Sequence, residues 1–231
     1  MIRRKKIGEI RIASPYALGD GELSRLAAPM TEGKGPADAP LGGRREVVEL
    51  DLAGIVGPVV LKYYARGGIL SNFVKETYLR TGKTRGRREF DLLREFRGRG
   101  GNAPEPVAFA HAGRLLYRGW LVTRKIPDAR SLADLALSDE AAALRLMAGV
   151  CRQVDLLIES RILHVDLHPG NVLVDAAGTV HIIDFDKGRR FRLGTRLLRR
   201  RYLSRWRRAV TKYGLPESLT ERLASGLRPW Q

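Results

Sequence analysis

The stretch ILHVDLHPGNVLVDAAGTVHIIDFDKG, residues 162–188, constrains the fold more than any other part of the sequence. It holds two short apolar runs, NVLVD and TVHIID, that are joined by the residues AAG. Apolar runs on either side of a glycine-containing turn predict a β-hairpin. Asp166 and Asn171 precede the first strand and Asp184 ends the second, so the hairpin is expected to bring these side chains into one site.

The three side chains suit phosphoryl transfer. Carboxylate and amide oxygens are hard ligands of the kind that Mg²⁺ prefers, and a carboxylate that is not bound to metal can accept a proton from a hydroxyl group. The spacing Asp166-x-x-x-x-Asn171, with His164 two residues before the aspartate, is that of a kinase catalytic loop, and D-F-D at Asp184 stands where such enzymes have D-F-G. We therefore predict Asp166 as the base and Asn171 and Asp184 as ligands of Mg²⁺.

For two further polar residues of this stretch, the sequence allows two possible roles each. His168 either hydrogen-bonds within the loop, which we favour, or contacts the substrate. Asp186 replaces the glycine of D-F-G, and it either supports the loop or assists a second metal ion.

The first half of the chain contains the partners that such a site needs. EVVELDLAG and PVVLKYYA predict two strands of an antiparallel sheet, and Lys62 lies in the second. In TRGRREFDLLREF, Phe90, Leu93 and Phe96 recur at helical spacing, with Glu89 beside this stripe. Because kinases hold the ATP phosphates with a strand lysine that pairs with a helix glutamate, we predict these roles for Lys62 and Glu89.

Taken singly, each feature has an ordinary explanation, such as a capped turn, a surface lysine or an exposed helix residue. Four elements in the expected order together favour an ATP-dependent, kinase-like phosphotransferase. The phosphate-binding loop is the least marked part. Gly42 and Gly43 are the best candidates, although their spacing is not G-x-G-x-x-G, since backbone N–H groups can cradle a phosphate without that pattern.

Other segments complete the expected architecture. RLLYRGWLVTRKI, residues 114–126, predicts two strands that meet at Arg118 and Gly119. Ser138 is expected to cap a helix with acidic residues in its first turn, and Cys151 lies on the apolar stripe of that helix as a small core residue.

The predicted fold class is α+β, with two lobes of the protein-kinase type. Residues 1–45 are poorly patterned. Residues 46–127 form an N-lobe that binds nucleotide and consists of an antiparallel sheet with one helix. Residues 128–231 form a compact, mainly helical C-lobe with the catalytic loop and basic C-terminal helices, which suits a small or lipid-linked acceptor better than a protein.

The charge favours anionic partners, because 42 Lys and Arg residues oppose 25 Asp and Glu residues, for a net charge of +17. Residues 189–210 predict an amphipathic helix with arginine outside its apolar stripe of Leu198, Tyr202, Trp206 and Val210. This helix either packs on the lobe with a solvated basic face or contacts anionic groups such as lipid headgroups or phosphates, at about 1 kcal/mol per basic residue. Nucleic acid is not favoured as a partner, since no recognisable binding motif is present.

A cytoplasmic protein is expected, and any contact that it makes with a membrane is expected to be peripheral. The sequence has a single cysteine, which excludes an internal disulfide. Its apolar runs fall short of the roughly 18 to 20 residues that cross a bilayer, and its basic beginning has no apolar region behind it of the kind that signal peptides have.

Five segments resemble the Kdo kinase branch of the lipopolysaccharide kinase family, over roughly residues 55–190 of the chain. They are LKYYARGG, YLRTGKTRGRREFDLLREF, PEPVAFA, LVTRKIPDARSLADL and IIDFDKG. The resemblance implies a protein-kinase-like fold, the use of ATP and Mg²⁺, and transfer of a phosphoryl group to 3-deoxy-D-manno-octulosonic acid (Kdo) on lipid A. It implies the roles given above for Asp166, Asn171, Asp184, Lys62 and Glu89.

We therefore predict an ATP-dependent kinase for a sugar hydroxyl of the lipopolysaccharide inner core. Two alternatives stay open. One is a kinase-like enzyme for another small molecule, a heptose or a protein. The other is a non-catalytic, basic pseudokinase that binds lipopolysaccharide or nucleic acid.

Overall fold

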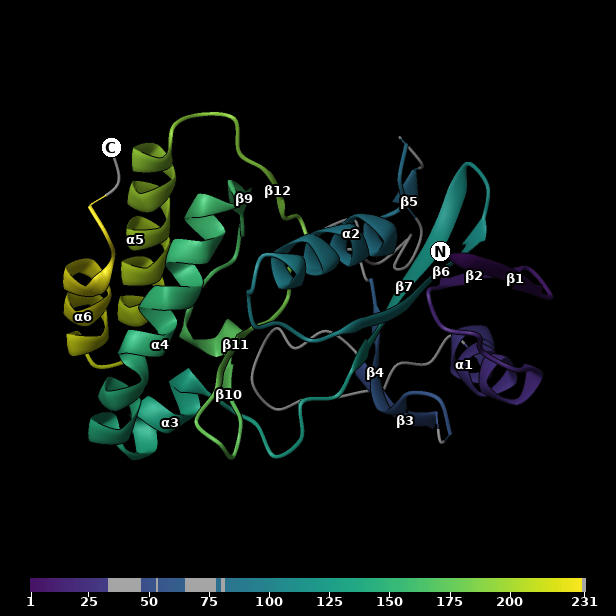
Figure 1. The fold of residues 1–231 in the computed structure, drawn as a ribbon, viewed down its shortest axis with the longest axis horizontal. Helices are drawn as coiled ribbons and strands as arrows, with labels where there is room; N and C mark the ends of the chain where they lie inside the picture. Colours follow the sequence, from purple (N-terminus) through teal and green to yellow (C-terminus); the bar gives the residue numbers. More distant parts are fainter. Residues whose placement is uncertain (33–46, 53, 65–77, 80–81, 230–231) are drawn as a thin grey trace. The chain divides into compact units, whose positions relative to one another are not determined.

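The computed structural model describes residues 1–32, 47–52, 54–64, 78–79 and 82–229. The chain divides into two compact units. The first comprises residues 1–91 and 105–125, and the second comprises residues 92–104 and 126–231. Each unit is described by itself (Figure 1).

The first unit is built on an antiparallel sheet in the order β1-β2-β6-β7-β4-β3, with the short β5 also paired to β7. Two helices accompany the sheet: α1, Asp20–Glu32, and the first turns of α2, Arg85–Gly98. The strands are β1 Arg3–Ile7, β2 Ile10–Ser14, β3 Val47–Leu52, β4 Gly57–Tyr63, β5 Tyr78–Leu79, β6 Pro106–Gly113 and β7 Leu116–Arg124.

Residues 1–32 are more regular than their sequence suggests, since they form β1, β2 and α1. The buried side of α1, with Leu26 and Met30 fully enclosed, packs on the sheet around Leu61 and Val122 to form the core of this unit. The expectation that residues 1–45 are poorly patterned is corrected here for residues 1–32, whereas the described part of residues 46–127 contains one helix, α2, as predicted. The sequence pattern fails because β1 is the string RRKKI, which is exposed along nearly its whole length and shows no apolar alternation.

The expected pair of strands around Arg118 and Gly119 is also wrong. Both residues lie inside the continuous strand β7, and the hairpin turn falls earlier, between β6 and β7. Gly113 makes this turn possible, because its φ is +93° and a Cβ there would lie 2.1 Å from the carbonyl oxygen of Leu116. The predicted strands over Val47–Leu52 and Gly57–Tyr63 and the helix over Arg85–Gly98 are confirmed.

The second unit is mainly helical, which confirms the predicted α+β class. In it α4, α5 and α6 lie side by side (Figure 1). Among the described residues, no helix is long and apolar enough to cross a membrane. The elements are β8 Arg130–Ser131, α3 Leu132–Ser138, α4 Glu140–Glu159, β9 Ile162–Leu163, the 3₁₀ turn η2 Pro169–Asn171, β10 Val172–Val174, β11 Val180–Ile182, β12 Arg189–Arg190, α5 Thr195–Lys212 and α6 Ser218–Gly226.

Helix α5 confirms the predicted apolar stripe. Leu198, Tyr202, Trp206 and Val210 are all exposed by 1% or less. Outside the stripe the helix is rich in arginine, most of it exposed, so the stripe is the apolar side that packs α5 into the unit.

Helix α4 begins one residue later than expected. Asp139 caps it by accepting a hydrogen bond from the Ala142 N–H at 2.8 Å, whereas Ser138 ends α3. Cys151 is buried in α4 as predicted. Burial raises the pKa of its thiol to about 11, with a further rise from the charge of Asp155.

Candidate functional site

In the first unit, Lys62 of β4 and Glu89 of α2 form a buried ion pair. The Lys62 Nζ lies 2.7 Å from Oε1 and 2.9 Å from Oε2 of Glu89. The side chains are only 13% and 3% exposed, and the hydroxyl of Tyr64 donates a third hydrogen bond to Oε2 at 2.7 Å. The structure thus brings together the two residues that the sequence singled out as phosphate-positioning partners.

Close packing of α2 on the sheet places Glu89 within reach of Lys62. At Gly86, one turn before Glu89, a Cβ would lie 2.4 Å from the carbonyl oxygen of Trp120 in β7. Any larger residue would therefore push the start of the helix away from the strands. Gly42 and Gly43, the candidates for the phosphate-binding loop, lie outside the described residues, so that assignment stays a prediction.

In the second unit, the predicted hairpin is present as β10 and β11, which pair antiparallel with Val172 opposite Ile182. The loop before it is tied to the segment after it. His164, only 1% exposed, contacts the Ile183 carbonyl through Nε2 at 2.9 Å, and the Ile183 N–H donates to the Asn171 carbonyl at 3.0 Å. These bonds hold the segments that carry Asp166, Asn171 and Asp184 side by side.

The amide of Asn171 is oriented by the loop itself. Its Nδ2 donates to the backbone carbonyl of Asp166 at 2.9 Å, which leaves Oδ1 as the acceptor end of the amide. Asp184 has a φ of +63°, a strained value for a residue other than glycine, and such strain is commonest at functional sites.

The donor set fits Mg²⁺, since the Asn171 Oδ1 and the Asp184 carboxylate are hard oxygen ligands and Mg²⁺ keeps several waters or substrate oxygens. Within the described part of the chain, no three His, Cys, Asp or Glu side chains cluster in a metal-binding arrangement.

His168 hydrogen-bonds within the loop, in line with the interpretation favoured from the sequence. Its Nδ1 accepts the Gly170 N–H at 3.1 Å, which caps η2 and leaves the proton of the neutral ring on Nε2. Burial lowers the pKa of His168; the nearby Asp184 opposes this shift and Lys212 adds to it. Asp186 is also buried, at 4% exposure.

A residue that the sequence did not single out contacts the predicted base. Arg205 of α5 donates a hydrogen bond from Nη2 to Oδ1 of Asp166 and forms an ion pair with it. Both side chains stay partly exposed, at 36% for Arg205 and 40% for Asp166. The two residues are 39 positions apart, so no local motif could have revealed the contact.

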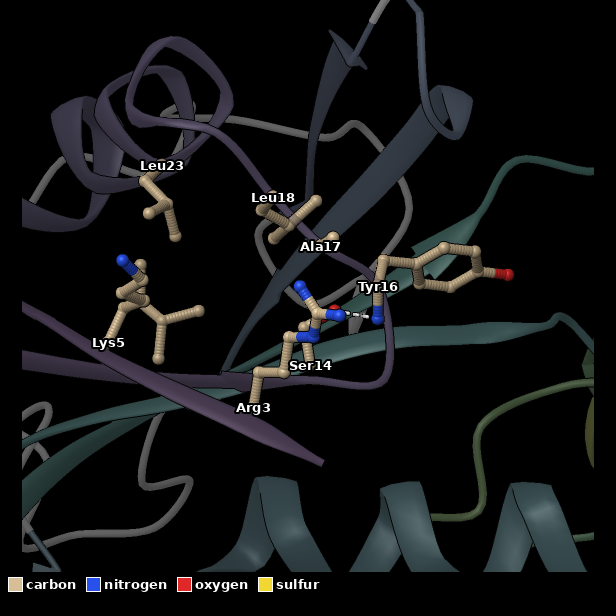
Figure 2. A pocket seen from close by; sticks show the side chains of 8 residues that line it. Arg3, Lys5, Ser14, Tyr16, Ala17, Leu18 and Leu23 are labelled. Carbon is tan, nitrogen blue, oxygen red and sulfur yellow. Dashed lines mark hydrogen bonds between the residues drawn. The ribbon is translucent and has the colours of Figure 1, made fainter. Parts of the chain in front are cut away.

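Two hollows in the first unit flank the β1–β2 hairpin, outside the predicted site. The smaller, of about 150 Å³, has Arg3 and Lys5 of β1 across from Leu18 and Leu23 (Figure 2). The larger, of about 750 Å³, is strongly basic, and its lining includes Arg4, Lys6, Arg11, Lys83, Arg87 and Arg114. Lys5 of β1 and Ile12 of β2 line both hollows, so the two adjoin at this hairpin.

Comparison with known proteins links the chain to one family. Residues 43–226 match the lipopolysaccharide kinase (Kdo/WaaP) family, which covers both the Lys62–Glu89 pair and the Asp166–Asp184 segment.

Individual relatives give the same picture. The chain is 36% identical over 130 residues to a 3-deoxy-D-manno-octulosonic acid kinase of Vibrio cholerae and 37% identical over 134 residues to one of Photobacterium profundum. These matches cover 55% and 56% of each chain, so the alignment spans little more than half the length of these relatives. A protein of the same name from Stenotrophomonas maltophilia is 33% identical over 174 residues, which are 74% of this chain and 68% of that protein. The resemblance inferred from the motifs is confirmed.

Proposed function

Because the chain belongs to the lipopolysaccharide kinase (Kdo/WaaP) family, we propose that it transfers the terminal phosphoryl group of ATP to a hydroxyl of Kdo linked to lipid A. The observation that carries this proposal is the Lys62–Glu89 ion pair. A buried ion pair is weak evidence for stability, because desolvation of both charges offsets their attraction. The near-complete burial of this pair is better explained by a role in ligand binding, and a kinase requires this pair for the ATP phosphates.

Each predicted residue has one role in this reaction. Lys62, oriented by Glu89, positions the phosphates of ATP. Asn171 and Asp184 hold Mg²⁺, which supplies neutralising charge to the phosphate oxygens when it is bound. Asp166 orients the sugar hydroxyl and accepts its proton. The protein contributes mainly position and charge, since the transfer itself asks for little covalent chemistry.

The acceptor accounts for the basic composition. The relatives are named for an acidic sugar, and the outward face of α5 carries exposed arginines such as Arg200, Arg207 and Arg208. We place this face against lipid A phosphates or the anionic headgroups around them, as a peripheral contact at the cytoplasmic side of the inner membrane.

The test is incubation of the protein with Mg·ATP and Kdo-bearing lipid A, followed by mass spectrometry for one added phosphate. Asp166→Ala is the matched control. It should keep the circular dichroism of the parent and lose at least about 10²-fold in rate, the lower end for a positioned base.

Other outcomes would redirect the assignment. Phosphate appearing on a heptose or on a free metabolite, and not on Kdo, would change the acceptor. Binding of the lipid with no ATP turnover on any acceptor would identify a non-catalytic binding protein.

A further inference from the structure

The C-terminal half of α5 lies along the catalytic loop. Arg205 contacts Asp166, and Tyr213, directly after the helix, has its ring 5.8 Å from the ring of His168. Lys212 lies two helical turns after Arg205, on the same side of the helix, with its Nζ 5.2 Å from the ring of Tyr213. Two cationic side chains of one helix are therefore next to the loop that carries the predicted base.

An acidic acceptor needs such cations. The segments that carry Asp166 and Asp184 are hydrogen-bonded to each other, so two carboxyl side chains belong to one part of the unit. A sugar carboxylate that enters beside them is repelled by like charge unless a cation lies close by. Arg205 is the cation in direct contact with Asp166.

The guanidinium group of Arg205 has more hydrogen-bond donors than its contact with Asp166 uses. A guanidinium group offers five N–H donors in a rigid fork, and one Nη serves Asp166. Its Nε is buried, and none of the described residues accepts a hydrogen bond from it. With about a third of its side chain exposed, Arg205 can bind a second carboxylate without releasing the first.

We propose that Arg205, supported by Lys212, forms the subsite that binds the carboxylate of the acceptor sugar next to Asp166. This inference rests on the proposed function and adds to it the residues that select an acidic sugar over a neutral one. Arg205 bridges base and substrate, so that the hydroxyl of the sugar is presented to Asp166 while its carboxylate is held by the guanidinium fork.

The test compares Arg205→Ala and Arg205→Lys with Arg145→Ala, a control that removes one exposed arginine from α4, outside the face of α5 that is placed against lipid A. We expect Arg205→Ala to raise the KM for Kdo-bearing lipid A by about 10- to 100-fold, as loss of a charge-assisted contact predicts, and to leave the KM for ATP unchanged. Arg205→Lys should lie between the two, because lysine keeps the charge and loses the fork. Arg145→Ala should match the parent.

A second acceptor, in which the Kdo carboxylate is converted to an amide, separates binding of the substrate from orientation of Asp166. The parent enzyme should lose about the same factor with this acceptor, and Arg205→Ala should then cause little further loss, because the two changes remove one interaction. An equal loss on the acid and on the amide would overturn the subsite and leave Arg205 as a residue that only positions Asp166.

Calorimetric binding of Kdo-bearing lipid A without ATP distinguishes this inference from the proposed function. A parent protein that binds the lipid more tightly than Arg205→Ala but does not phosphorylate it would refute the kinase activity and keep the subsite. Equal affinities for parent and variant would refute the subsite, whatever the activity.

Discussion

Removal of Glu89 is the sharpest test of how the first unit is built around its ion pair. Glu89→Ala deletes a carboxylate that is 3% exposed and accepts hydrogen bonds from Lys62 and Tyr64. The ammonium group of Lys62, only 13% exposed, then loses the carboxylate that pairs with it. Breaking a buried pair in this way costs about 3 to 5 kcal/mol, because the remaining charge is not compensated.

A double replacement should cost much less than the single one. In Lys62→Met with Glu89→Leu, neither charge remains, and apolar residues of similar volume are often neutral or stabilising in place of a buried pair. The remaining cost is that of the Tyr64 hydroxyl, which no longer has the Glu89 carboxylate as its acceptor. This loss amounts to about 1 to 3 kcal/mol of stability. Adding Tyr64→Phe should recover most of that loss.

The assay is urea unfolding of the parent, the single, double and triple variants, combined with hydrogen exchange of the amides in β4 and β7. Hydrogen exchange localises the loss of stability, since β4 carries Lys62 and β7 is paired with β4. Additive free energies of unfolding for the two single replacements, or a cost below about 1 kcal/mol for Glu89→Ala, would show that the pair is not energetically coupled and that the reasoning from its burial is wrong.

Four further outcomes follow from single sites. Asp184→Asn should abolish the response of phosphotransfer to added Mg²⁺, and an unchanged Mg²⁺ titration would contradict its assignment as a ligand. Cys151 should resist iodoacetamide at pH 8 in the folded protein and react in urea, as mass spectrometry can show, because its raised pKa of about 11 keeps the thiol protonated. By linkage, its contribution to stability is full below the ordinary thiol pKa and is lost as the pH rises through about 11. Trp206→Ala should cost about 3 to 5 kcal/mol in urea unfolding, since the side chain is fully buried. Gly86→Ala should cost about 1 to 3 kcal/mol by overpacking α2 against β7, and a neutral effect would mean that the helix can shift.

The sequence predicts best where chemistry and local pattern coincide. The β10–β11 hairpin follows from two apolar runs around a glycine, and the positions of Asp166, Asn171 and Asp184 follow from the hairpin. The apolar stripe of α5 follows from the helical spacing of its apolar residues. In these cases the interactions that decide the structure lie within a few residues of each other, so a local pattern contains them.

Prediction fails where partners are distant in sequence. Strand β2 pairs with β6, with Ile12 opposite Ala110, and this pairing gives order to an N-terminal segment that has no clear alternation of its own. Gly119 was taken for a turn because isolated glycines usually mark one. In the structure it sits within β7, where a Cβ would lie 3.2 Å from the ring of Tyr117, so packing against an aromatic neighbour is what disfavours a larger residue.

The contact of Arg205 with Asp166 raises the question of which arginines in a basic helix make specific tertiary contacts. Helix α5 has arginine at most positions outside its stripe, and composition cannot tell which of them makes a tertiary contact. The angular position around the helix can, because at 3.6 residues per turn Arg199 and Arg205 are the two arginines of α5 that lie nearest to the stripe. These two arginines are only partly exposed, and both reach out of the helix, Arg199 to the carbonyl of Ala224 at 3.0 Å and Arg205 to the predicted base. In a strongly basic amphipathic helix, the arginines that border the apolar stripe are therefore the ones to examine for a specific role, while those on the outer face supply general attraction to anions.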